Sequence, residues 1–132
     1  MSPEHREFAQ LMVDRARADL RAARQLLAVE DGDQTIIGFH LHQAVEKALK
    51  AFLAGSEIEI PYTHDLAKLI TAISTNGLDV PAGVASVVWL TPWGTTFRYE
   101  DPGDDLDTDA ALEGATAAID LAEEALVQDV ER

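Results

Sequence analysis

The chain has 132 residues, a length typical of one domain with a single hydrophobic core. Its 24 acidic and 10 basic side chains give a formal net charge of -14, which argues against a sequence-independent nucleic-acid-binding protein with a broad basic face. The chain has no cysteine, which excludes disulfides and thiolate metal sites and is compatible with a reducing compartment.

The first predicted helix runs from about Pro3 to Val29, a stretch without internal glycine or proline. Its apolar residues recur at steps of three, four and seven, and we expect the arc that they define to be buried or to face a cleft: Phe8, Leu11, Ala18, Ala22, Leu26 and Val29. Asp33 can cap a second helix from about Gln34 to Ala54, which Gly55 ends. Apolar residues on several sides of this second helix place it at the centre of the fold.

Thr63 is expected to cap a third helix that ends at Asn76-Gly77. Its predicted buried face consists of Leu66, Leu69, Ile70 and Ile73. Pro81 suits the first turn of a shorter fourth helix that ends near Pro92. A fifth helix is defined by the spacing of Leu112, Ala115, Ile119, Ala122 and Leu126, and its alanines permit close packing against a neighbouring helix or a second copy of the chain.

No segment alternates as a strand would, so we predict an all-α up-and-down bundle of four to five helices, forming one domain over residues 1–132. The longest connection, residues 93–106, holds Arg98 and Tyr99. From Tyr99 onward lie 12 of the 24 acidic residues, which form either a solvated face or a surface for a basic partner. The N-terminus is polar and no apolar run approaches the roughly 18 residues that cross a bilayer, so we expect a soluble, cytoplasmic protein.

The second helix contains the stretch HQAVEKALKAFL, residues 42–53. Helical geometry places Gln43, Lys47 and Lys50 on one strip beside His40, with His42 and Glu46 on the adjacent strip. Because His40 and His42 lie about 200° apart on the helix, they cannot share a metal ion through one face. With four histidines and no cysteine, we expect no metal site and no cofactor.

Charged residues also mark the first helix. Asp19 lies within its apolar arc, and because a buried unpaired charge costs several kcal/mol, we expect it to face Arg15, Lys47 or Arg98. Arg17, Arg21 and Arg24 form a basic stripe on another side of the helix, which is either a solvated face or a surface for a phosphate.

Four motifs in this order resemble the HEPN domain family, and the resemblance spans about residues 7–129. They are Ala18-Asp19-Leu20 with Ala23 and Leu26-Leu27, then His42 to Ala51 (HQAVEKALKA), then Tyr62 to Leu66 (YTHDL), then Phe97-Arg98-Tyr99. The resemblance implies a bundle of four or five helices that commonly dimerises and often works beside a minimal nucleotidyltransferase. It also implies similarity to the helical substrate-binding domain of aminoglycoside nucleotidyltransferases.

Many HEPN proteins are metal-independent ribonucleases that carry an arginine followed, after four to six residues, by a catalytic histidine. Here the positions that match this spacing after Arg98 are Gly103, Asp104 and Asp105, and no histidine follows His64. Carboxylates at these positions would repel a phosphate. We therefore do not carry the ribonuclease activity over to this chain.

The resemblance does carry over a ligand-binding cleft, formed by Asp19, His42, Gln43, Glu46, Lys47, Lys50, His64, Arg98 and Tyr99. The alternative is that these residues form an ionic network that only fixes helix packing. The resulting hypothesis is a non-catalytic, homodimeric helper that binds a nucleotide or nucleotidyltransferase substrate and acts with a nucleotidyltransferase, in a toxin-antitoxin-like or stress system. The alternatives are an unconventional ribonuclease that uses His42 or His64, and an interaction module that docks through its acidic last helix.

Overall fold

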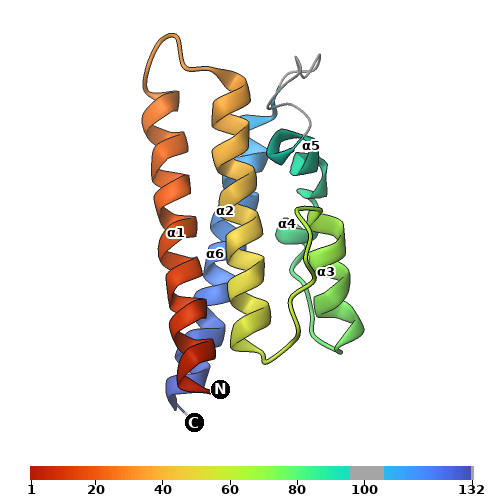
Figure 1. Ribbon diagram of the computed structural model, residues 1–132. Coiled ribbons are helices and arrows are strands. Elements are labelled where there is room, and N and C mark those ends of the chain that lie inside the picture. The colour runs from red at the N-terminus through yellow and green to blue at the C-terminus, as the bar shows by residue number, and fades with distance from the viewer. Residues whose placement is uncertain (96–105, 132) are drawn as a thin grey trace.

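The computed structural model describes residues 1–95 and 106–131, and these two ranges form an all-α bundle without a strand (Figure 1). Three long helices, α1 (Pro3–Leu27), α2 (Gln34–Gly55) and α6 (Thr108–Glu131), pack along one another. Both α2 and α6 run opposite to α1 (Figure 1). A short connection reverses the chain between α1 and α2, and an extended connection with several short helices carries it back from the end of α2 to the start of α6. The first and last described residues therefore lie at the same end of the bundle.

Local signals begin the first two helices. The N–H of His5 donates a hydrogen bond to the Ser2 hydroxyl at 3.2 Å, and Pro3 occupies the first turn of α1. The Asp33 carboxylate accepts from the N–H groups of Thr35 at 2.8 Å and Ile36 at 3.2 Å. The predicted Asp33 cap is confirmed, and the short connection after α1 turns α2 antiparallel to it.

The buried side of α1 differs from the predicted one. Phe8 and Leu11 are 39% and 47% exposed, whereas the buried seam consists of Ala9, Val13, Ala16, Leu20 and Ala23. Both sets have helical spacing, so the period alone does not choose between them. The alanines of the seam let α1 approach α2 and α6 closely, which improves packing and leaves the larger apolar side chains outside.

The second helix is central, as predicted. Its buried residues point in several directions, toward α1, α6, α3 and α5, and include Ile37, Leu41, Ala44, Val45, Ala48, Leu49 and Phe52. The buried residues of α6 are mostly alanine, and they allow this helix to pack closely against α2 and α1 of the same chain. They include Ala111, Ala115, Ala118, Ile119, Ala122 and Leu126.

The third helix, α3 (Leu66–Thr75), begins later than predicted. Its cap is Asp65, whose carboxylate accepts from the N–H of Ala67 at 3.0 Å. The Thr63 hydroxyl instead accepts from the N–H of Asp65 at 3.1 Å and shapes the turn before the helix. The predicted Thr63 cap is therefore wrong. The burial of Leu66, Leu69 and Ile73 is confirmed, whereas Ile70 is only half-buried.

The predicted fourth helix is broken into three short elements: α4 (Ala82–Ala85), the 3-10 helix η1 (Val88–Leu90) and α5 (Thr91–Gly94). Pro92 explains the last of these breaks, because a proline disrupts the interior of a helix but fits its first turn, and it therefore starts α5 instead of ending a longer helix. The Trp93 ring of α5 packs directly on α2, since a Cβ added at Gly38 would lie 1.9 Å from Trp93 Cδ1. This contact brings α5 beside the polar residues of α2.

Candidate functional site

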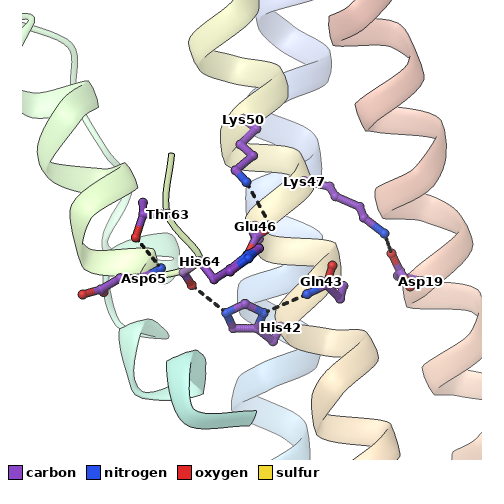
Figure 2. Close-up of polar contacts among 9 residues, drawn as sticks. All are labelled: Asp19, His42, Gln43, Glu46, Lys47, Lys50, Thr63, His64 and Asp65. Atoms are coloured by element: carbon purple, nitrogen blue, oxygen red, sulfur yellow. Dashed lines mark hydrogen bonds and ion pairs between the residues drawn. The ribbon is translucent and has the colours of Figure 1, made fainter. Parts of the chain in front are cut away.

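The polar side chains of α2 lie between α1 and the connection that precedes α3 (Figure 2). Asp19 reaches them from α1 on one side, and His64 reaches them from the connection on the other side. Within α2, His42 and Glu46 are buried, while Gln43, Lys47 and Lys50 are half-buried. Their hydrogen bonds therefore decide whether each residue serves the fold or a ligand.

Asp19 forms the polar centre of the α1–α2 contact. Its side chain is 13% exposed, and its Oδ2 accepts from Lys47 Nζ at 2.6 Å. His40 Nδ1 donates to Oδ1 of the same carboxylate at 2.9 Å. Of the three predicted partners, Lys47 holds Asp19, Arg15 is exposed, and Arg98 lies outside the described residues. Because an unpaired buried carboxylate is costly, these two bonds hold α1 against α2.

His42 is fully buried, and both of its ring nitrogens are used inside the fold. Burial lowers its pKa below the usual 6.5, although the nearby Glu46 carboxylate opposes this shift. Nε2 lies 3.0 Å from the backbone carbonyl oxygen of His64, and because a carbonyl only accepts, Nε2 carries the hydrogen. Nδ1 is then the acceptor, and the Gln43 side-chain amide donates to it at 3.4 Å. A neutral His42 thus fixes the backbone of the connection before α3.

Glu46 fixes the side chain of His64. The Glu46 side chain is 5% exposed, and its Oε1 accepts from His64 Nδ1 at 2.9 Å. Lys50 Nζ donates to the other oxygen, Oε2, at 3.2 Å. Because the carboxylate occupies Nδ1, the second ring nitrogen of His64 points away from α2, and the His64 side chain is 62% exposed. Among the predicted cleft residues that the structure describes, His64 has the most exposed side chain.

The backbone of α5 closes the buried side of this network. A Cβ added at Gly94 would lie 2.1 Å from His42 Nδ1, so only glycine fits against the ring. Thr91, also in α5, accepts a hydrogen bond from the N–H of Leu66 at 3.2 Å through its hydroxyl. The short helix α5 therefore holds both the His42 ring and the start of α3.

The predicted cleft residues fall into two networks on opposite sides of the α2 strip. One consists of Asp19 and Lys47; the other consists of His42, Gln43, Glu46, Lys50 and His64. The last two predicted residues, Arg98 and Tyr99, lie outside the described residues. Sequence reasoning missed His40, Thr91 and Gly94 as parts of these networks. Only His40 carried a signal, since it lies seven residues before Lys47 and so on the same side of α2.

A scan against models of protein families matches the HEPN domain over residues 9–131. The chain belongs to the HEPN family. Neither the curated proteins nor the solved structures contain a match. Membership of the HEPN family indicates a function connected with RNA or with a nucleotidyltransferase.

The HEPN resemblance rests on motifs that largely serve the fold. In HQAVEKALKA, His42 and Glu46 point toward α3 and α5, while Lys47 points toward α1. In YTHDL, His64 supplies the carbonyl that His42 binds and Asp65 caps α3. Within residues 1–95 and 106–131 no group of three or more His, Cys, Asp or Glu side chains is placed to hold a metal ion. None of the helices in this part of the chain is both long and apolar enough to span a membrane.

Proposed function

We propose that this HEPN protein is a non-catalytic helper that binds a nucleotide or a nucleotidyltransferase substrate. It acts with a minimal nucleotidyltransferase, as half of a toxin-antitoxin-like or stress-response pair. One observation carries the proposal: Lys47, Lys50 and His64 are each held by a carboxylate and still reach solvent, with side chains 27%, 18% and 62% exposed. Donors fixed in this way bind with a smaller loss of side-chain entropy than free surface side chains would.

The charge balance of the strip favours a small ligand. Asp19 and Glu46 offset the formal charges of Lys47 and Lys50, so the strip is not a strong trap for polyanions. Each ammonium nevertheless carries three donors, and one of them suffices for its carboxylate. The remaining donors can bind one phosphate or the hydroxyls of a sugar. A single nucleotide fits this arrangement better than a long polynucleotide, which the net charge of -14 repels.

We also propose that the protein forms a homodimer, which exposed apolar side chains on α1 and α2 support. Phe8 and Leu11 of α1 are 39% and 47% exposed, and Ile36 of α2 is 48% exposed. Ile36 lies one turn before His40 and so adjoins the Asp19 network, whereas Phe8 and Leu11 lie toward the start of α1. Exposed large apolar side chains such as these are of the kind that an interface between protein chains covers.

The test of the proposed function combines partner recovery with nucleotide titration. The tagged protein is recovered from its native cells at moderate salt, and we expect a nucleotidyltransferase-sized partner in stoichiometric amount. Lys47→Gln keeps a donor for Asp19 but removes the charge, so it should weaken nucleotide binding roughly tenfold in a protein that is less stable but still folded, because His40 also binds Asp19. Lys68→Gln, which removes an exposed charge from α3, is the matched control. Unchanged binding in Lys47→Gln, or recovery of the protein alone, would count against the proposal.

The Glu46–His64 contact favours one alternative, an unconventional ribonuclease. A carboxylate that binds Nδ1 orients an imidazole as in general-base catalysis, and the exposed ring of His64 meets this requirement. His42 does not, because it is buried and both of its nitrogens are engaged. This alternative predicts RNA cleavage by the purified protein that is lost in His64→Ala. A preparation that leaves a range of RNAs intact at several pH values would eliminate it.

A further inference from the structure

The buried carboxylate of Glu46 supports two nitrogen donors that lie nearer to solvent. Glu46 is 4% exposed, whereas the side chains of Lys50 and His64 are 18% and 62% exposed. Both donors end on the same carboxylate, Lys50 on Oε2 at 3.2 Å and His64 on Oε1 at 2.9 Å, so their nitrogens are neighbours. A ligand that approaches from solvent therefore meets donors first and the carboxylate last.

The position of His64 is fixed twice. His42 binds its backbone carbonyl at 3.0 Å, and Glu46 binds its side chain. Since Nδ1 donates to Glu46, the nitrogen that remains available is Nε2, on the outer edge of the ring, and it donates to a ligand when the ring carries its second proton. No hydrogen bond to this nitrogen is found in the part of the chain that the structure describes. The outer edge of the ring is therefore held in one place while it faces solvent.

The start of α3 adds a positive field beside His64. The α3 helix begins at Leu66, two residues after His64, so the positive end of its dipole lies nearby. Its first N–H groups are taken by the Thr91 hydroxyl and the Asp65 carboxylate, so α3 supplies field but not free donors. The Asp65 carboxylate, turned toward Ala67, offsets part of this field. The binding donors must therefore come from Lys50 and from the protonated ring of His64.

We propose that Lys50 and His64, held by Glu46, form the phosphate subsite of the ligand site and bind a phosphate monoester. A terminal phosphate offers three acceptor oxygens and a charge that suits an ammonium beside a protonated imidazole. This inference rests on the proposed function and names the part of the nucleotide that this side of α2 recognises. The phosphate belongs either to a free nucleotide or to the end of an RNA, and the same donors would bind both.

The experiment titrates the full-length protein with AMP, with adenosine, and with a short oligoribonucleotide that carries either a 5′-phosphate or a 5′-hydroxyl. We expect AMP to bind at least about tenfold more tightly than adenosine, because a charge-assisted hydrogen bond accounts for a difference of this size. A comparable preference for the phosphorylated oligonucleotide would identify an RNA end as a ligand of the same subsite. Equal binding of AMP and adenosine, and of both oligonucleotides, overturns the phosphate subsite but leaves nucleoside recognition, and with it the proposed function, in place. Absence of binding by all four overturns both.

Two variants separate ligand contact from a role in the fold. In His64→Asn the side-chain amide can still donate to Glu46 but has no equivalent of Nε2, so AMP binding should fall roughly tenfold while the unfolding midpoint stays unchanged. His64→Gln, whose longer amide reaches the outer position, should recover part of the affinity. Arg21→Gln removes a cation from α1 and should leave AMP binding unchanged. Full AMP affinity in His64→Asn, or a loss of affinity in Arg21→Gln instead, would overturn the subsite.

Discussion

Gly94→Ala tests the closest contact of the site, in which the α5 backbone lies against the His42 ring. The added Cβ would lie 2.1, 2.2 and 2.5 Å from three ring atoms, far inside the roughly 3.5 Å of a normal carbon contact. The ring is fully buried and hydrogen-bonded at both nitrogens, so it cannot move aside without loss. Overpacking costs about 1–3 kcal/mol, and loss of the His42–His64 bond adds about 1 kcal/mol. Alanine returns about 0.4–1 kcal/mol through the unfolded state, which leaves a net loss of about 1–3.6 kcal/mol.

The matched control is Gly83→Ala, which makes the same change in another short helix. Its Cβ would meet Ala117 Cβ at 3.7 Å, an ordinary contact, and neither glycine has a positive φ. Gly83→Ala should therefore be neutral or stabilise the protein by up to about 1 kcal/mol. Urea unfolding followed by far-UV circular dichroism measures both variants against the wild type. Equal midpoints for the two variants would refute the close packing of α5 on His42.

Two further predictions concern pH and assembly. Because the pKa of His42 is lowered by burial, the unfolded chain binds this proton more readily than the fold does, so the free energy of unfolding should fall as pH drops below 6.5. Urea midpoints above and below this pH should diverge more in the wild type than in His42→Gln, and equal pH dependence would contradict a buried neutral imidazole. Leu11→Lys should weaken the proposed homodimer by about 2 kcal/mol, roughly 30-fold, in sedimentation equilibrium. Val127→Lys, 54% exposed on α6, should not, and a monomeric wild type would remove the basis of this prediction.

Where a local signal defines an element, the sequence was sufficient. Asp33 caps α2 as expected, and the several apolar sides of α2 correctly placed it at the centre. The period of 3.6 residues likewise identified α1, α3 and α6, although the ends of the helices shifted by a few residues. These features depend on residues close together in the chain, which is why a single sequence reveals them.

Where tertiary packing decides between equivalent local choices, the sequence was not sufficient. Two apolar sets on α1 share one period, and only the fit of Ala9, Ala16 and Ala23 against neighbouring helices selects the buried one. Thr63 and Asp65 are both good caps, and the contact between Leu66 and Thr91, 25 residues apart, accompanies the choice of Asp65. Such contacts between distant residues leave no trace in a local pattern.

The predicted cleft residues can stabilise the fold and also bind a ligand, because the two roles use different atoms of a residue. The HEPN motifs place His42 and Glu46 inside the fold, so loss of activity on replacing either residue would follow from misfolding as readily as from lost ligand contact. His64 differs, because its backbone and Nδ1 serve the fold while its outer edge faces solvent. His64→Asn preserves the backbone carbonyl and the donor to Glu46 and removes only the outer nitrogen. A loss of binding in this variant can therefore be attributed to a lost ligand contact.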